Sequence, residues 1–353
     1  MKNKWQLISV LQSKIFIPAS FLILFFLNPI FADGSVLSGT QRLDSLLFSE
    51  NLKSAFLYDT SGNLILESEL TWNSVNASWV EFAKTEYVWD SQGFLSQETE
   101  FFLDSLSNQI VGNKKLDYVR NSSGFVTMVT ENYWEANPGQ WTFAAKSEFT
   151  LNTNGEKLQQ VDFYWDPANN NWVNDWKFNF TLDANDNTVL VMGYYWEPTS
   201  LQWTEGWKAE YSYDASDNLT SQTAYYKDQN NSLWIPYEKI DYSYLTNGNI
   251  SIQTSYFKDS PTGPWISSEK YEYSYDANGN VSVQSAGFWN TSNNSWVNNW
   301  KFDYSYNNGF SLSDLIIPHY YQGNLLFNHM LTSYTFSYWE ASSSSWVPNE
   351  YWE

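Results

Sequence analysis

A 31-residue period runs through the chain and constrains its fold more than any other feature of the sequence. A lysine, a turn residue and a tryptophan each recur at this step. A sustained period of this length indicates stacked supersecondary units, each of which buries its apolar side against its neighbours. The repeated lysines are Lys53, Lys84, Lys115, Lys146, Lys177, Lys208, Lys239, Lys270 and Lys301. The repeated tryptophans are Trp79, Trp141, Trp172, Trp203, Trp234, Trp265 and Trp296, with Ile110 in one place.

Each copy of the repeat begins with an amphipathic segment. In residues 172–183, Trp172, Trp176, Phe178 and Phe180 fall on alternate positions, and polar residues such as Lys177 lie between them. Alternation with a period of two predicts a β-strand with one dry face and one wet face. The pattern places the opening tryptophan and the aromatic residues after it together on the dry face, and the lysine on the wet face.

A short turn follows each first strand. In the turn from Tyr275 to Asn280, Asp276 can accept hydrogen bonds from the turn backbone, and Gly279 supplies the positive φ that a short hairpin loop requires. Asp186 and Asp217 stand where other copies have glycine, and Asp tolerates positive φ better than most residues. The structural turn glycines predicted in this way are Gly62, Gly93, Gly124, Gly155, Gly248 and Gly279.

The repeat therefore predicts an all-β fold of antiparallel β-hairpin repeats, with about nine hairpins and about 18 strands. At ~4.8 Å per strand, these form one long sheet on the order of 85 Å wide, which must twist, coil or close. We expect a signal peptide at 1–32, a lead-in strand region at 33–52, the 31-residue β-hairpin repeats at 53–309 and an atypical C-terminal capping repeat at 310–353. The capping repeat contains both histidines, His319 and His329.

The N-terminus has the features of an export signal. A basic start precedes an apolar run from Ile15 to Phe31, and Ala32 is a plausible cleavage position. The run is shorter than the roughly 20 residues of a membrane-spanning helix, so a cleaved signal peptide is favoured over an uncleaved membrane anchor. Stable membrane insertion is therefore not expected. We predict a secreted or cell-surface protein. Without the three lysines of the signal, 15 basic residues face 39 acidic ones, a net charge of −24, and nucleic acid is not an expected partner.

Several turn sequences resemble a known repeat family. The hexamers 58–63, 213–218 and 275–280 resemble the YD repeats of Rhs-type proteins. The whole 31-residue unit, over residues 43–353, resembles tryptophan-rich repeat proteins exported by Bacteroidota, many of which are type IX secretion substrates. The resemblance implies a β-hairpin spiral at the cell surface or outside the cell. The sequence leaves no room for a type IX sorting domain before Glu353, so we expect either another export route or a truncated sequence. It has no toxin segment of the Rhs kind, and toxin delivery is not carried over.

The aromatic residues permit two interpretations. Burying each large ring stabilises a protein by roughly 1.5–3 kcal/mol, so the rings can form the core of a chain that has no cysteine. Alternatively, tryptophan and tyrosine rings stack on the apolar faces of sugars and form a ligand platform. The candidates for stacking are the tryptophans that end the second strand of a repeat beside a polar loop, namely Trp134, Trp165, Trp196 and Trp289. The expected partner is a polysaccharide or another surface protein.

Catalysis has little support in the sequence. Two histidines and no cysteine remove most nucleophile–base arrangements, and the carboxylates are distributed by the repeat, so we predict no enzyme, no catalytic residue and no cofactor. Turns rich in Asp and Asn could bind Ca²⁺, but their spacing does not match an EF-hand loop, and turn chemistry accounts for these residues without a metal.

The lysine of the repeat is followed two residues later by an acid in most copies, which predicts a solvated ladder of charge pairs on the wet face. We therefore predict a non-enzymatic, secreted or cell-surface repeat protein with a structural or adhesive role. Two alternatives remain. One is a carbohydrate-binding array that uses exposed Trp and Tyr rows. The other is an outer-membrane β-barrel, because about 18 amphipathic strands after a signal sequence could form one.

Overall fold

The computed structural model describes residues 41–42, 45–49, 51–312, 315–316 and 328–352. The predicted signal peptide at 1–32, most of the lead-in region and much of the C-terminal insertion, including His319, lie outside the described residues. The elements within the described ranges are β-strands, as the repeat predicts. They are β1 (Gln41–Arg42), β2 (Ser45–Ser49), β3 (Leu52–Tyr58), β4 (Leu64–Asn73), β5 (Ser78–Trp89), β6 (Leu95–Asp104), β7 (Gln109–Arg120), β8 (Val126–Glu135), β9 (Gln140–Leu151), β10 (Lys157–Asp166), β11 (Asn171–Leu182), β12 (Thr188–Glu197), β13 (Gln202–Tyr213), β14 (Leu219–Lys227), β15 (Trp234–Tyr244), β16 (Ile250–Phe257), β17 (Ile266–Tyr275), β18 (Val281–Asn290), β19 (Ser295–Ser311), β20 (Leu315–Ile316), β21 (His329–Glu340) and β22 (Ser345–Trp352).

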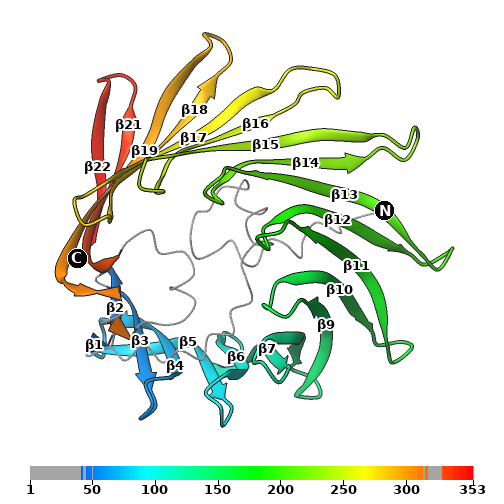
Figure 1. Cartoon of the computed structure of the whole chain (residues 1–353). Coiled ribbons are helices and arrows are strands. Elements are labelled where there is room, and N and C mark those ends of the chain that lie inside the picture. Colours follow the sequence, from blue (N-terminus) through cyan, green and yellow to red (C-terminus); the bar gives the residue numbers. More distant parts are fainter. Residues whose placement is uncertain (1–40, 43–44, 50, 313–314, 317–327, 353) are drawn as a thin grey trace.

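The strands form one long antiparallel sheet. Each strand pairs with the next from β2 to β19, and the series continues through β21 to β22. Figure 1 shows the sheet curving round so that its strands are arranged about a common centre. The sheet is open, because no pairing joins β22 to β2 among the described residues, whereas the outer-membrane alternative requires a closed one. Segments from the two ends of the chain meet where β1 pairs in parallel with β20.

The tight turns have the chemistry that their sequences suggest. Gly62, Gly93, Gly124, Gly155, Gly248 and Gly279 have φ between 80° and 92°, and Asp186 and Asp217 have φ of 65° and 61°. In the first turn, the Asp59 carboxylate accepts the backbone N–H groups of Ser61 at 2.8 Å and Asn63 at 2.9 Å. The same side chain accepts a third bond from the Asn63 amide at 2.9 Å. These local bonds fix each hairpin turn before any contact between repeats is made.

A β-bulge interrupts the first strand of each repeat. In the pairing of β12 with β13, Gly193 lies opposite Trp207 and Tyr194 lies opposite Glu205, so Gly206 is an extra residue. An extra residue in one strand turns the side chains beyond it to the other face of the sheet. The equivalent extra residues in the other repeats are Phe82, Asn113, Ala144, Asp175, Tyr237, Ser268, Asn299 and Asn349.

The bulge makes one prediction about the faces wrong. Simple alternation placed Trp172 on the same face as Trp176, but the extra residue between them puts Trp172 on the face that carries the repeated lysines. Its ring lies 5.3 Å from the ammonium of Lys146 in the preceding repeat. We call this face the lysine face and the opposite one the core face. The aromatic residues of each repeat are therefore divided between the two faces instead of sharing one.

The core face carries the buried aromatic and aliphatic side chains. One cluster joins the first repeats, and a second lies in the middle of the sheet between β11 and β13. The members of the first cluster are Phe56, Tyr58, Leu64, Tyr87 and Leu95. The members of the second are Phe178, Phe180, Val191, Ala209 and Tyr211. Because each cluster contains side chains from successive hairpins, burial ties neighbouring repeats together, as expected for a stacked repeat protein.

In the later repeats, the tyrosine that precedes the tight turn joins one repeat to the one before it. Tyr213, Tyr244, Tyr275 and Tyr306 each donate a hydrogen bond to a backbone carbonyl 25 residues earlier, at 2.7–3.0 Å. The acceptor is the first residue of the preceding second strand. In the second repeat the indole Nε1 of Trp89 makes the equivalent bond, to Leu64 O at 2.7 Å. This bond gives a physical reason for the tyrosine of the hexamer motif.

Candidate binding surface

The lysine face carries a ladder of ion pairs. Seven of the repeated lysines contact the acid two residues later in the same strand. Their exposed side-chain fractions are only 15–29%, so the ladder is less solvated than the sequence suggested. The pairs are Lys84–Glu86 (2.6 Å), Lys115–Asp117 (3.5 Å), Lys146–Glu148 (2.7 Å), Lys208–Glu210, Lys239–Asp241 (2.7 Å), Lys270–Glu272 (2.9 Å) and Lys301–Asp303 (2.7 Å).

Two aromatic rings cover these lysines, one from the second strand of the same hairpin and one from the first strand of the next repeat. The ammonium of Lys146 lies 4.3 Å from the ring centroid of Phe163 and 5.3 Å from that of Trp172. Lys208 lies in the same way over Tyr225 at 4.3 Å and Trp234 at 5.5 Å. A cation within about 6 Å of a ring centroid is attracted by the ring quadrupole. The repeated lysine therefore links the strand that carries it to the following hairpin.

Tryptophan pairs form a row at the loop end of the lysine face. In six hairpins, the tryptophan that ends the second strand lies opposite the tryptophan that opens the next strand. Ring centroids are 5.1–5.4 Å apart and the planes meet at 67–72°, the edge-to-face geometry that aromatic pairs prefer. The pairs are Trp72–Trp79, Trp134–Trp141, Trp165–Trp172, Trp196–Trp203, Trp289–Trp296 and Trp339–Trp346. We call this set the Trp row.

The structure brings the four predicted stacking residues into this Trp row. Trp134, Trp165, Trp196 and Trp289 are half-buried, and each has one edge-to-face tryptophan partner. They lie beside the polar loops; the first three belong to successive hairpins, and Trp289 follows after two copies that have lysine at this position. Whether they bind a ligand stays a prediction. Part of each ring packs against its partner tryptophan, and part stays accessible to solvent. The Trp row therefore combines a structural role with a partly accessible surface.

A second aromatic row, which the sequence reasoning missed, is more exposed. It consists of exposed aromatic residues at the position just before the one that holds tryptophan in most second strands, and its side chains lie on the core face at the loop end. The members are Phe102 (43% exposed), Tyr133 (38%), Tyr164 (43%), Tyr226 (44%), Phe257 (41%) and Phe288 (43%). We call this set the Tyr/Phe row. A signal is present in the sequence, because these positions repeat with the same 31-residue step and directly precede the position of the predicted stacking tryptophans.

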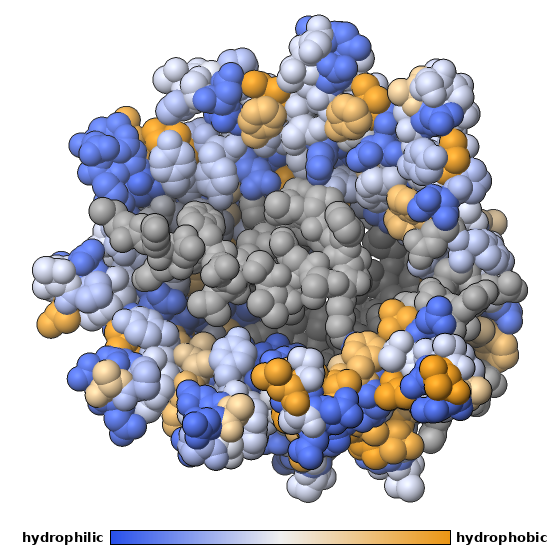
Figure 2. All heavy atoms as spheres, turned by 180° about the vertical axis from the view of Figure 1, so that it is seen from behind, coloured by the Kyte–Doolittle hydropathy of each residue, from blue (hydrophilic) through white to orange (hydrophobic). Residues whose placement is uncertain are grey.

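The surface between these rows and the tight turns is mixed in character. Figure 2 shows apolar residues in separate groups among hydrophilic ones on the face that it presents. At the turn end of the lysine face, a shallow groove of about 350 Å³ is lined by residues of β7 to β10, including Val119, Glu148 and Thr150. Its lining has neither the convergent polar groups nor the depth of a typical small-molecule site.

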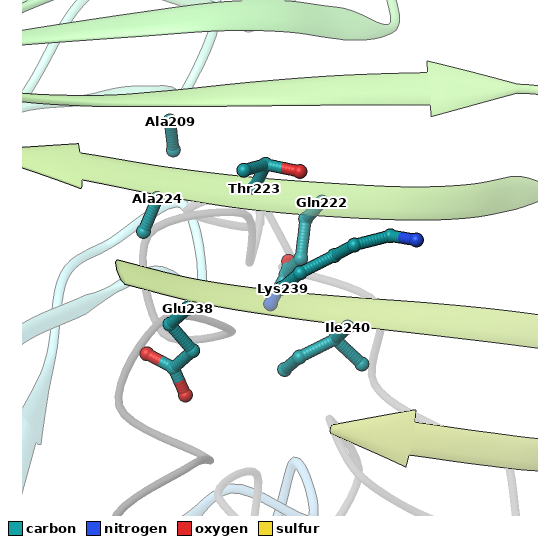
Figure 3. Close-up of a pocket in the computed structure, with 7 residues that line it drawn as sticks. All are labelled: Ala209, Gln222, Thr223, Ala224, Glu238, Lys239 and Ile240. Atoms are coloured by element: carbon teal, nitrogen blue, oxygen red, sulfur yellow. The ribbon is translucent and has the colours of Figure 1, made fainter. Parts of the chain in front are cut away.

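Polar side chains are also buried on the core face. Gln222 is 2% exposed and Gln253 is 3% exposed, and among the described residues their amide nitrogens have no hydrogen-bond partner. Tyr211 and Tyr242 lie opposite these two residues, and their hydroxyl groups are buried and likewise have no partner in the described ranges. Figure 3 shows Gln222 beside Ile240 at a small packing gap that leaves no room for a water molecule, with Ala209 on the neighbouring strand. Buried polar groups without partners destabilise a fold by roughly 1–3 kcal/mol each.

Carboxylates of the first repeats lie on the core face with partners of their own. Glu98 accepts a bond from the Tyr118 hydroxyl at 3.3 Å, and Glu100 pairs with Lys114 at 3.0 Å. Burial, together with the neighbouring charge of Glu100, raises the pKa of Glu98. Among the described residues, no group of three or more His, Cys, Asp or Glu side chains is placed to hold a metal ion. In the same ranges, no helix has the length and apolar character needed to cross a membrane.

Comparison with known proteins gives weak similarities. Residues 245–324 match the model of a family of unknown function, DUF3836. A protein of unknown function from Bacteroides fragilis is 16% identical, with 36% of this chain and 90% of that chain covered and a TM-score of 0.33. A DUF3836 family protein from Bacteroides vulgatus is 21% identical, with 31% and 90% covered and a TM-score of 0.22. The Tc holotoxin pore of Photorhabdus luminescens, which includes TccC3, is 10% identical, with 82% and 16% covered and a TM-score of 0.29. A search of curated proteins found no match.

These comparisons bear on the two families of repeat proteins that the sequence resembles. The Tc toxin matches have TM-scores of 0.27 and 0.29, so the expected likeness to Rhs-type repeat proteins stays a prediction. The likeness to exported tryptophan-rich repeat proteins of Bacteroidota stays a prediction. At these TM-scores the matches say nothing about what the chain binds, so its function is inferred from its own surface.

Proposed function

We propose that the chain is a non-catalytic repeat protein that acts outside the cell or at its surface as an adhesive scaffold, and that its loop-end aromatic rows bind polysaccharide. The observation that carries this proposal is the Tyr/Phe row, whose six rings stay about 40% exposed on both sides of the half-buried copy at Tyr195. Large aromatic side chains that recur on an exposed edge need a reason beyond core packing. A sugar ring offers an apolar face that matches them.

The geometry suits a linear ligand. Each repeat contributes two strands spaced by about 4.8 Å, so equivalent rings recur about every 10 Å across the sheet. A chain that runs across the strands therefore meets a ring of the Tyr/Phe row in one hairpin after another. Many weak contacts of this kind add up to firm retention, because linking binding events raises their effective concentration. Regular repetition favours such a polymer over a single compact ligand.

The test is retention on insoluble polysaccharides. The variant Tyr133→Ala, Tyr164→Ala, Tyr226→Ala removes three exposed rings, and we expect it to lose retention while its far-UV circular dichroism stays unchanged. The matched control removes three equally exposed apolar side chains from the turn end of the lysine face. These are Leu57 (54% exposed), Val88 (50%) and Val119 (45%).

We expect the control variant to be retained like the original protein. Equal retention of the tyrosine variant would contradict the proposal. A folded protein that no polysaccharide retains would also contradict it, and would leave another surface protein as the partner of the scaffold.

A further inference from the structure

One lysine of the ladder differs from its equivalents. From Lys84 to Lys301, every repeated lysine except Lys177 has a carboxylate two residues later, and each of those pairs is formed. After Lys177 the position is Asn179, whose side-chain oxygen accepts a bond from the Gln159 amide at 3.0 Å. In the described part of the chain, no ion pair of Lys177 is formed. Its three N–H donors therefore have no carboxylate to bond.

The surroundings of Lys177 are aromatic. Its ammonium lies 4.6 Å from the ring centroid of Tyr194 and 5.0 Å from that of Trp203. Partial burial lowers the pKa of Lys177, because the charged form loses water and gains no carboxylate in return. Rings attract the cation but accept no directed hydrogen bond of normal strength. An anionic oxygen that approached from solvent would supply what the missing acid supplies in the other repeats.

The Trp row is continuous around this lysine. The pairs Trp165–Trp172 and Trp196–Trp203 belong to the hairpins on either side, each with ring centroids 5.1 Å apart. In later repeats the row is interrupted, because Lys227 stands in place of a tryptophan and pairs with Glu205 at 3.1 Å. Lys177 thus lies in the part of the sheet where a ligand would find both aromatic rings and an unpaired cation.

We propose that the lysine face around Lys177 binds a carboxylate-bearing sugar, so that the ligand of the scaffold is an acidic polysaccharide of low charge density. This inference rests on the proposed polysaccharide binding. The sugar rings would contact the Trp row, and the carboxylate would take the position that Glu148 and Glu210 occupy beside their own lysines. Only one interior repeat lacks its acid, so the site accepts a single carboxylate.

Low charge density follows from the rest of the chain. The protein has a formal net charge of −21, and the lysines on either side of the site are already neutralised. A dense polyanion would place further charges against Glu148 and Glu210, where like charges repel. At physiological salt, interactions beyond about 8 Å are largely screened, so a lone carboxylate at Lys177 is governed by its immediate neighbours.

The test compares two forms of one polymer. Glucuronoxylan carries isolated carboxylates on a neutral backbone, and its carboxyl-reduced form has the same backbone without charge. We expect the purified chain to bind the acidic form about tenfold or more tightly, as a charge-assisted hydrogen bond predicts. The variant Lys177→Gln should remove this preference, and Asn179→Asp should remove it too by supplying an internal partner. The control Lys208→Gln, at the equivalent position of the next repeat, should keep it.

The outcomes separate the two proposals. Equal binding of both polymers by the original chain, or an acid preference that survives Lys177→Gln and Asn179→Asp, would overturn the role of Lys177 and leave polysaccharide binding standing. Loss of binding to the carboxyl-reduced polymer in the tyrosine variant would support the proposed function independently, because its three rings lie on the core face and Lys177 lies on the lysine face. Binding of neither polymer by the folded chain would overturn this inference, and retention on other polysaccharides would then decide the proposed function. Far-UV circular dichroism of each variant confirms that the sheet is intact.

Discussion

The hydrogen bond between successive repeats is the most direct test of how this sheet is held together. The Tyr244 hydroxyl donates to Leu219 O at 2.8 Å, and burial raises the pKa of this hydroxyl. Tyr244→Phe keeps the ring and removes only the donor. A net hydrogen bond contributes about 1 kcal/mol, and the full cost of leaving a buried carbonyl without its donor is at most about 3 kcal/mol. We therefore expect Tyr244→Phe to lower the free energy of unfolding by about 1–3 kcal/mol.

The assay should resolve where stability is lost. In a repeat protein each unit contacts only its neighbours, so the loss should appear first in the two hairpins that the bond joins. Urea denaturation gives the total change, and native-state hydrogen exchange locates it in β14 and β15. The control is Tyr226→Phe, since the Tyr226 side chain is 44% exposed. A loss at Tyr226 equal to that at Tyr244, or no loss at Tyr244, would refute this account of the bond.

Three further changes test other parts of the fold. Gly124 has φ of +85°, and a Cβ there would lie 2.5 Å from a phenyl ring of the preceding turn. Gly93 has a similar φ but open space around it. In thermal denaturation, Gly124→Ala should therefore lower the melting temperature of the protein by more than Gly93→Ala does. Gln222→Leu should raise the stability in urea by about 1–3 kcal/mol because it removes two unpartnered buried atoms, whereas Gln284→Leu should lower it because Gln284 accepts a tyrosine hydroxyl at 3.1 Å. Hydrogen bonds in the turn lower the pKa of Asp214. Its contribution to stability is therefore full above about pH 4 and is lost as the pH falls through the lower, folded-state pKa. When stability is measured as a function of pH, Asp214→Asn should show a smaller loss of stability over this acidic range.

The parts of the fold that depend on local chemistry could be predicted from the sequence. A turn such as 59–63 needs an acceptor at its first position and positive φ at its fourth, and few residue types supply these, so the period reveals the hairpins directly. The antiparallel pairing then follows from the short hairpin turns, whereas the number of hairpins alone left open whether the sheet coils or closes. The ion pairs of the lysine ladder were also foreseeable, because Lys and acid two residues apart in a strand share a face.

The division of the aromatic residues between two faces could not be predicted in the same way. The bulge that divides them occurs at the same position in each repeat, but the extra residue is Phe82 in one copy, Gly206 in another and Tyr237 in a third. Any residue can occupy it, because the bulge is set by how the two strands pair. Alternation alone therefore assigned the opening tryptophans to the wrong face. The predicted stacking tryptophans lie opposite these residues, so they too are found at the loop end of the lysine face and not on one continuous dry face.

The variation between repeats reflects alternative ways of joining neighbouring turns. Leu182 stands where other copies have the tyrosine that bonds back to the preceding repeat, and it cannot donate such a bond. The turn that follows carries Asp186 in place of glycine, and its carboxylate accepts the amides of Asn152 at 3.0 Å and Asn154 at 2.5 Å from the preceding turn. The strained φ of 65° at Asp186 is thus accompanied by two bonds that no glycine could make. Where the repeat departs from its consensus, a contact of different chemistry therefore joins the same two turns. The acid that is missing after Lys177 is a departure of the same kind, but the described residues offer no replacement for it. By the same reasoning, the replacement is a ligand that binds from solvent.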